Sequence, residues 1–380
     1  MDFVRSVISC WGGLPVLFVF SIVVFFHELG HFLVARWCGV RVLVFSIGFG
    51  PELFGFDDRH GTRWKVSAVP LGGYVKFLGD ENAASVPDQE AVAQMSEAER
   101  LESFPQKSVG ARAAVVAAGP IANFLVAIAI FAGLAMAFGK PSTAARVDIV
   151  QPGSPAEEAG FQAGDLVLSI NGRRIDSFTE MQRIVSLSAG EKLTVVVRRE
   201  DRELTLTAVP RLLEGKDPFG DGTRRWILGI TRSPDPTERM YESVSPIGAV
   251  AWGVSETWFV IETTFTSIGR MFVGRESADQ VGGPIRIAEE SCKVATLGLA
   301  ALLHLTALLS ISIGLLNLFP IPLLDGGHLL FYAIEKLRGR PLSDRAQEFG
   351  FRIGLAVVLM LMIFATYNDI SRYVRRWFIS

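Results

Sequence analysis

The chain has 380 residues, of which 49% are hydrophobic and 20% are charged, and its formal net charge is −2. This is too apolar for an ordinary soluble enzyme and too charged for a pure bundle of membrane helices, so we expect several membrane spans and at least one water-soluble domain. The charge balance offers no broad basic excess that could neutralise phosphates, which argues against nucleic acid as a partner.

The first apolar stretch runs from about Leu14 to Trp37 and is long enough to cross a bilayer core of about 30 Å. It contains His27, Glu28 and His31. Two histidines four residues apart share one face of a helix, so both can reach one metal ion, whereas Glu28 is offset by about 100° and can act on a water as a general base. Because ionisable groups within a membrane are costly and usually functional, we favour a metal site over a chance match, and a retained span over a cleaved signal peptide.

The loop that follows divides into two parts. Two short β-prone runs flank the turn at Pro70–Gly73 and predict a β-hairpin. Residues 81–106 are acidic and polar, with a helical patch, and are interpreted as a solvent-side connector. A second span is predicted from about Ala113 to Phe138.

Residues 146–210 change in character. Short alternating runs of Val, Ile and Leu are separated by turn signals such as Pro152-Gly153 and Asn171-Gly172, which predicts a compact α+β domain. Residues 211–236 have the Pro, Gly and charge content of a linker, with one extra strand. Residues 244–272 mix tryptophans with glutamates, which indicates an amphipathic helix at the membrane interface rather than a span.

The third predicted span, from about Leu297 to Leu318, ends in a stretch that two prolines and two glycines interrupt between residues 320 and 327. Irregular backbone at membrane depth survives only where it is buried in protein or lines a cavity. Asp325 lies in this break and is our candidate for the third protein ligand that a hydrolytic zinc site requires. The alternative role for Asp325 is to cap the helix that follows.

Two other polar residues lie in the same break. His328 could be the ligand in place of Asp325, although we place it behind the ligands or on the helix surface. Asn317 could donate a hydrogen bond to a substrate backbone or a developing oxyanion, or it could only satisfy helix carbonyls that the break leaves free. A fourth span is predicted from about Ile353 to Tyr367, and basic residues mark the first and third loops as cytoplasmic.

Five motifs, in order along the whole chain, resemble the site-2 protease family of intramembrane zinc metalloproteases, specifically its bacterial RseP-type branch. They are His27-Glu-Leu-Gly-His31, Gly72-Gly-Tyr-Val-Lys-Phe-Leu-Gly79, Ala118-Gly-Pro-Ile-Ala-Asn-Phe124, Gly282-Gly-Pro-Ile-Arg-Ile-Ala288 and Asn317-Leu-Phe-Pro-Ile-Pro-Leu-Leu-Asp-Gly-Gly-His328. Together they are far more specific than the short histidine motif alone.

The resemblance implies roles for particular residues. Glu28 would be the catalytic base, and the zinc ligands would be His27, His31 and Asp325. The hairpin would dip into the membrane and present the substrate as an extended strand. The substrate-binding residues would then be Gly72, Gly73, Tyr74, Val75 and Asn317.

The predicted fold class is a polytopic α-helical membrane protein of about four transmembrane helices, with a membrane-associated β-hairpin and an inserted α+β PDZ domain. Residues 1–145 and 296–380 would form the two parts of a membrane protease domain. The resemblance implies that residues 146–210 are a PDZ domain, and residues 211–295 would be a linker with an amphipathic segment. RseP-type proteins carry two PDZ domains in tandem, whereas one segment matches here.

The predicted activity is regulated, zinc-dependent proteolysis of membrane proteins with a single transmembrane helix, such as anti-sigma factors or leftover signal peptides. By family likeness, a site-1-type protease makes a first cut. We expect the enzyme in the bacterial inner membrane, with its PDZ domain on the extracytoplasmic side. Two rivals are a non-catalytic PDZ adaptor, which would not need Glu28, and a metal transporter, which would have little use for a PDZ domain.

Overall fold

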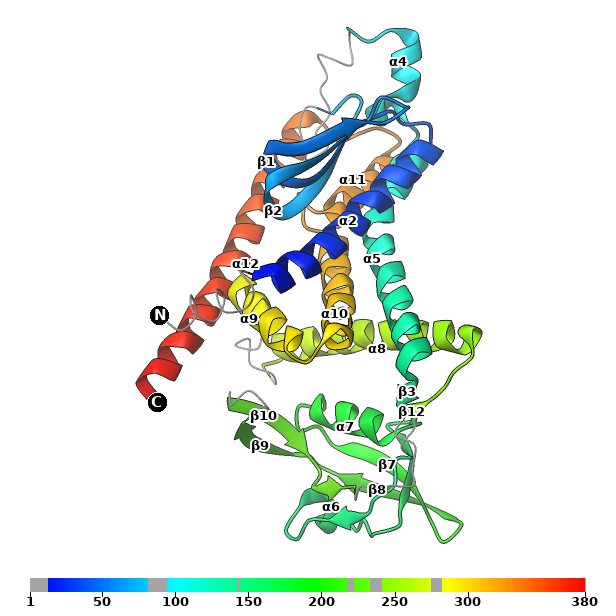
Figure 1. Cartoon of the computed structure of the whole chain (residues 1–380), viewed down its shortest axis with the longest axis vertical. Coiled ribbons are helices and arrows are strands. Elements are labelled where there is room, and N and C mark those ends of the chain that lie inside the picture. Colours follow the sequence, from blue (N-terminus) through cyan, green and yellow to red (C-terminus); the bar gives the residue numbers. More distant parts are fainter. Residues whose placement is uncertain are drawn as a thin grey trace. The chain divides into compact units, whose positions relative to one another are not determined.

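The computed structural model describes residues 13–80, 94–141, 144–216, 222–232, 241–274 and 282–379. Within these ranges, four helical segments are long and apolar enough to cross a membrane, which confirms the predicted polytopic fold (Figure 1). These segments are α2 (Leu14–Trp37), α5 (Val109–Phe138), α10 (Leu299–Leu318) and residues Arg345–Arg372 of α12 (Asp344–Ile379).

The chain divides into two compact units. The first comprises Met1–Phe131, Glu256–Ile261 and Asp279–Ser380, and the second comprises Ala132–Ser255 and Glu262–Ala278. The predicted amphipathic segment is a helix, α8 (Pro246–Phe272), which contributes residues to both units. Its location at a membrane interface and the predicted domain boundaries stay predictions.

Small residues let the helices of the first unit pack closely. A Cβ atom on Gly30 of α2 would lie 2.3 Å from the carbonyl oxygen of Ala118 in α5, so only glycine permits this crossing. On the other side of α5, a Cβ on Gly314 of α10 would lie 3.2 Å from the Cβ of Asn123. These approaches bring α5 into close contact with both α2 and α10.

Helix α9 (Pro284–Ala295) is tied to α12 through a buried carboxylate. The side chain of Asp369 accepts hydrogen bonds of 3.0 Å from the backbone N–H groups of Gly283 and Arg286. These groups belong to the first turn of α9, where no intrahelical acceptor is available. Asp369 therefore caps α9 from a neighbouring helix.

A β-hairpin follows α2, but its turn is not where the sequence predicts it. Strands β1 (Val42–Asp57) and β2 (Arg63–Phe77) are joined at residues 58–62. The two β-prone runs on either side of Pro70–Gly73 do not pair with each other. Instead, the apolar segment Val44–Ile47 inserts between them, pairing with Arg63–Val66 on one side and with Gly73–Lys76 on the other.

This arrangement makes Gly73–Lys76 an edge segment, because the pairing within the described residues gives it a strand partner on one side only. The sheet packs against α2 (Figure 1). At this contact, Phe45 and Trp64 stack on each other, and both rings lie edge-on to Phe32. The sheet is therefore attached to the helix that carries the histidine motif.

The first unit also contains the short elements α4 (Glu97–Glu102), η2 (Phe104–Gln106) and α11 (Asp325–Arg338). The second unit contains β3 (Lys140–Pro141) and β12 (Tyr241–Glu242), which pair with each other. Helix α4 is the helical patch predicted for the acidic connector, and residues 81–93 of that connector lie outside the described residues.

We use the name inserted domain for residues 144–216 and 222–232, which share one apolar core within the second unit. A four-stranded sheet has the order β6-β5-β7-β8, and Phe161, Val167, Val195 and Val197 lie at the centre of the core. The elements are β4 (Ile149–Val150), α6 (Pro155–Glu158), β5 (Leu166–Ile170), β6 (Arg173–Arg174), α7 (Phe178–Ser186), β7 (Leu193–Arg199), β8 (Arg202–Ala208), β9 (Arg211–Lys216), β10 (Gly222–Ile227) and β11 (Ile230–Thr231).

The predicted linker contains more structure than expected. Strands β9 and β10 pair as an antiparallel hairpin, with Arg211 opposite Ile227, and β11 pairs with β4. The Pro, Gly and Asp residues that are typical of linkers lie between the two strands of this hairpin. Averaged over residues 211–236, they made the whole segment resemble a linker. Residues 217–221 and 233–236 lie outside the described residues.

Candidate metal centre

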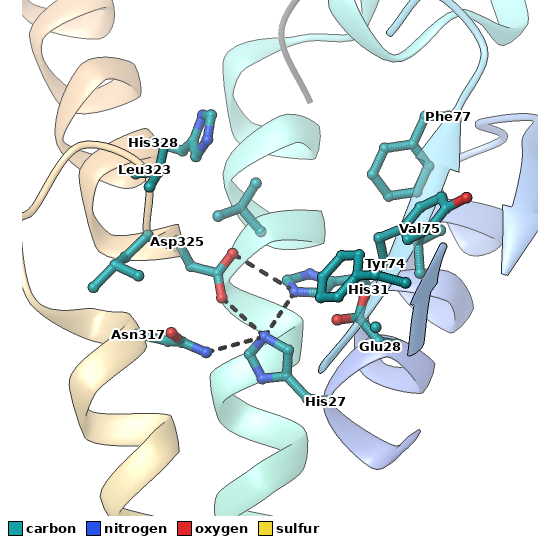
Figure 2. A pocket seen from close by; sticks show the side chains of 14 residues that line it. His27, Glu28, His31, Tyr74, Val75, Phe77, Asn317, Leu323, Asp325 and His328 are labelled. Atoms are coloured by element: carbon teal, nitrogen blue, oxygen red, sulfur yellow. Dashed lines mark hydrogen bonds and ion pairs between the residues drawn. The ribbon is translucent and has the colours of Figure 1, made fainter. Parts of the chain in front are cut away.

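Three side chains from two distant parts of the chain converge in the first unit. His27 and His31 lie on the buried face of α2, and Asp325 opens α11. The Nε2 atoms of the two histidines are 3.3 Å apart. The carboxylate of Asp325 approaches His27 Nε2 at 3.2 Å and His31 Nε2 at 3.6 Å, and Figure 2 shows it pointing toward both imidazoles.

The spacing and chemistry of these groups fit a zinc ion. Zinc bonds of about 2.0–2.1 Å in a tetrahedral site separate neighbouring ligand atoms by roughly 3.3 Å, close to all three distances. One oxygen of Asp325, Oδ2, is buried and lies 3.2 Å from His27 Nε2, but it makes no hydrogen bond of acceptable geometry with the described residues. Such an atom normally costs free energy, so a cation that the two imidazoles and this carboxylate can share would complete the group.

Close helix packing places the two imidazoles. A Cβ atom on Gly119 of α5 would lie 2.3 Å from His31 Nε2 and 2.9 Å from the Cε1 atom of His27. Any other residue at position 119 would therefore collide with both rings. The glycine within the Ala118–Phe124 motif is thus explained by the room that the histidines need.

A tight turn places Asp325. After α10 ends at Leu318, the chain turns so sharply that Leu323 adopts a φ of 98°, which is unfavourable for a residue other than glycine. Cβ atoms on Gly326 and Gly327 would lie 2.2 Å and 2.4 Å from the carbonyl oxygens of Phe319 and Ile321. The proline- and glycine-rich break predicted from sequence therefore folds the start of α11 back against the end of α10.

The other ring nitrogen of each histidine also has a neighbour. His31 Nδ1 lies 2.9 Å from the backbone oxygen of Val115, and His27 Nδ1 lies 3.2 Å from the side-chain amide of Asn123. Both rings are thereby turned so that Nε2 faces Asp325. Asn123 is a site residue that the sequence analysis did not single out, although it belongs to a motif of α5. The signal that could have found it is a lone amide in an apolar span.

Glu28 lies beside this cluster but is not part of the three-residue group. It is buried and lines a pocket of about 380 Å³ together with the two histidines and Asp325. The backbone of β2 approaches Glu28 closely, since a Cβ atom on Gly73 would lie 3.0 Å from the Cγ atom of Glu28. A carboxylate in this position can act on a molecule held in the pocket.

Most of the predicted substrate-binding residues line the same pocket. These are Gly73, Tyr74 and Val75 of the edge segment, and Asn317, whose amide nitrogen lies 3.2 Å from His27 Nε2. Gly72 does not line it. Its φ of 119° and the Phe49 ring 2.5 Å from where its Cβ would be explain why a glycine stands there, and its role in substrate binding stays a prediction.

His328, the alternative ligand, also lines the pocket but lies outside the three-residue group. Its ring packs against Phe351, with ring centroids 5.5 Å apart, and lies near Tyr332. The structure therefore brings Asp325, rather than His328, to the two histidines.

Comparison with known proteins gives matches over nearly the whole chain. The model of peptidase family M50 matches residues 15–361. The chain is 50% identical to "Putative zinc metalloprotease R01501" of Rhizobium meliloti (strain 1021), over 93% of this chain and 95% of that protein. It is also 41% identical to the metalloprotease MmpA of Caulobacter vibrioides, over 94% of each chain.

Among solved structures, a short part of the chain is similar to a PDZ domain. The match to the PDZ domain of HtrA3 bound to a phage-derived ligand has 32% identity, covers 17% of this chain and 62% of that one, and has a TM-score of 0.16.

Proposed function

Because the chain belongs to peptidase family M50 and is a multi-pass zinc metalloprotease, we propose that it cleaves single-span membrane proteins within or at the edge of the bilayer. The observation that carries this proposal is the position of the cluster. His27 and His31 lie on a helix long and apolar enough to span a membrane. Asp325 lies seven residues after Leu318, the last residue of a second such helix, α10.

In this proposal, the zinc ligands are the Nε2 atoms of His27 and His31 and the carboxylate of Asp325. Three protein ligands leave a fourth position open, which is the arrangement of catalytic rather than structural zinc sites. Zinc held by these three residues would supply Lewis-acid chemistry, lowering the pKa of a water and polarising the carbonyl of the peptide bond.

Glu28 supplies the proton transfers. Its carboxylate accepts a proton from the attacking water and delivers it to the amine that leaves when the peptide bond breaks. Its burial in the same pocket as the ligands, at one side of their group, supports this role.

The edge segment Gly73–Lys76 would bind the substrate as an additional strand. A helical substrate has no free amide at its peptide bonds, so it must unwind before it can be cut, and pairing with an edge strand stabilises the unwound form. Gly73 lets the substrate backbone come near Glu28, because a side chain there would meet Val24 and Glu28.

Asn317 would stabilise charge on the substrate carbonyl. When the Nε2 lone pair of His27 is used by zinc, it can no longer accept the amide N–H of Asn317, which lies 3.2 Å away. That donor then needs another acceptor in the pocket, and a carbonyl oxygen that becomes negative in the transition state is the best available.

The remaining finer assignments also belong to this proposal. The enzyme would lie in a bacterial inner membrane, with the inserted domain as an extracytoplasmic PDZ domain. Its substrates would be anti-sigma factors or leftover signal peptides that a site-1-type protease has already cut.

The test is cleavage in reconstituted vesicles. The purified full-length chain, loaded with zinc, should cut a tagged single-span protein, and mass spectrometry of the products should place the cut within or at the edge of the apolar segment. A chelator should stop cleavage, and added zinc should restore it. Cuts confined to soluble loops would reject the intramembrane assignment, whereas no cleavage combined with zinc flux would favour a transporter.

A further inference from the structure

Asn123 is a polar side chain with no exposure to solvent, on a helix that is otherwise almost entirely apolar. Its amide nitrogen, Nδ2, lies 3.2 Å from His27 Nδ1, and its oxygen, Oδ1, has no hydrogen-bond partner among the described residues. A buried amide oxygen without a donor costs about 1–3 kcal/mol. The position of Asn123 therefore calls for a second group that can satisfy its oxygen.

The proton on His27 provides that group. If Nε2 of His27 binds a metal, it must carry the lone pair, so the ring proton resides on Nδ1 and makes this atom a donor. A donor that faces an amide NH₂ makes no hydrogen bond. Rotation of the Asn123 amide by half a turn exchanges its oxygen and nitrogen without moving other atoms, and it brings Oδ1 to within reach of the Nδ1 proton.

His31 supplies an independent comparison. Its Nδ1 lies 2.9 Å from the backbone oxygen of Val115, which can only accept. The proton of His31 is thus fixed on Nδ1, and its Nε2 is left free for a metal. Both rings would therefore carry the proton on Nδ1 and leave Nε2 free for the metal. For His31 the partner of Nδ1 is a backbone atom, whereas for His27 it is a side chain, which a substitution can remove.

The surroundings hold Asn123 in place. Its backbone oxygen accepts a hydrogen bond of 2.8 Å from the Oγ atom of Ser310 in α10. A Cβ on Gly314, one turn further along α10, would lie 3.2 Å from the Cβ of Asn123. The side chain therefore has little freedom to leave the histidine.

We propose that Asn123 is a positioning residue for the metal centre, whose side-chain oxygen accepts the Nδ1 proton of His27 and so fixes the ring with Nε2 toward the metal. This inference rests on the proposed ligand role of His27. Partners of this kind fix the tautomer and orientation of metal-binding histidines, and their loss typically lowers metal affinity by about 10–100-fold.

The test compares three variants of the full-length chain in detergent. Asn123→Leu removes the acceptor at similar volume, Asn123→Asp keeps an oxygen in its place, and Ser310→Ala removes only the hydrogen bond to the backbone of Asn123. Zinc affinity is measured by competition with a chelator, and the visible spectrum of the cobalt-substituted protein reports the geometry of the ligands.

We expect Asn123→Leu to bind zinc about 10–100-fold more weakly and to alter the cobalt spectrum, whereas Asn123→Asp and Ser310→Ala stay within a few-fold of the wild type. Thermal unfolding of the metal-free proteins shows whether the fold is affected. If Asn123→Leu does not accumulate, Asn123→Ala takes its place, with the same expected loss.

The proposal is overturned if the variants without the acceptor keep wild-type affinity and spectrum, or if Asn123→Asp loses as much affinity as they do. If Ser310→Ala loses as much zinc affinity as Asn123→Leu, the effect comes from helix packing, and the proposal is also rejected. If the wild-type chain binds zinc but cleaves nothing, the proposed function is contradicted. The role of Asn123 can still be judged, because zinc affinity and the cobalt spectrum do not depend on cleavage.

Discussion

Two aspartates, one in each unit, differ in burial and in partners: Asp165 is fully buried, whereas Asp325 is partly exposed. In the inserted domain, the fully buried carboxylate of Asp165 accepts two hydrogen bonds from Arg199, at 2.7 and 2.8 Å, and one from the backbone N–H of Gln162. In the first unit, Asp325 faces two histidines and keeps one oxygen without a hydrogen bond. Protein donors thus satisfy the carboxylate of Asp165, whereas the carboxylate of Asp325 keeps an oxygen that a ligand can use.

Particular glycines of the two units can be compared as well. Gly30 and Gly119 of the first unit allow backbone or imidazole atoms to come within 2.3 Å of the position of a Cβ. Gly153, Gly164 and Gly172 of the inserted domain have positive φ angles and nothing within 4 Å of that position. Gly119 thus makes room for the two imidazoles and Gly30 for the packing of α2 on α5, whereas these three glycines of the inserted domain only make turns.

The largest expected effect comes from Glu28→Gln. A carboxamide cannot accept a proton from water, so cleavage of a tagged membrane substrate should fall by about 10²–10⁴-fold. Zinc content should not change, because Glu28 is outside the three-residue group. Cleavage near the wild-type rate, in detergent or in cells, would end the assignment of Glu28 as general base.

Substitution of glycines tests the contrast between the two units directly. Gly119→Ala places a methyl group against both imidazoles, so zinc content and cleavage should fall together by at least about tenfold, as when the support of a ligand is lost. Gly172→Ala should cost about 1 kcal/mol of backbone strain and leave zinc content unchanged. Equal zinc content in the two variants, measured by atomic absorption, would show that the close approach is not required.

The role of the inserted domain can be separated from the chemistry, since the three-residue metal group and Glu28 lie outside it. If the domain acts as a gate, replacing residues 146–232 by a flexible linker should permit cleavage of an untrimmed full-length substrate while trimmed substrate is still cut. If it docks peptides by strand addition, the same change should reduce cleavage of trimmed substrate and gain nothing with the full-length one. We expect the result of a gate, in which the untrimmed substrate becomes cleavable. Glu28→Gln, which should not cleave, serves as the negative control.

The smallest effect concerns the stability of the inserted domain. Burial raises the pKa of Asp165, but the hydrogen bonds from Arg199 and from the backbone of Gln162 outweigh it, so the pKa lies below its usual range. The carboxylate therefore stabilises the fold above the unfolded-state pKa of about 3.9, and this stability is lost as the pH falls through the lower, folded-state pKa.

Asp165→Asn should thus destabilise the isolated domain by about 1–3 kcal/mol at neutral pH and remove this acid dependence, as thermal unfolding followed by circular dichroism would show. Glu203→Gln is the matched control, because its exposed partner Arg198 lies 4.0 Å away and such pairs contribute less than about 1 kcal/mol. Equal loss in both variants would mean that the burial of Asp165 does not matter.

The sequence predicted the spans and the converging residues because these depend on local composition. The histidines and the glutamate interrupt an apolar run, and Asp325 lies in a proline- and glycine-rich break, so all of them can be recognised from the sequence alone. The pairing of Val44–Ile47 with two separate runs could not be predicted, since it depends on which strands meet in space. Asn123 was missed for the same reason, because its contact with His27 joins residues 96 positions apart.

The central claim is that Asp325 completes a metal centre with His27 and His31, and it can be tested most directly by the zinc content of two variants. Asp325→Ala should lose zinc and cleavage together, whereas His328→Ala should keep substantial zinc, because His328 packs against aromatic rings outside the cluster. X-ray absorption of the wild-type chain should then show one zinc per chain with two imidazole ligands and oxygen donors. Full zinc in Asp325→Ala, with loss in His328→Ala and a third imidazole in the wild-type spectrum, would contradict the account.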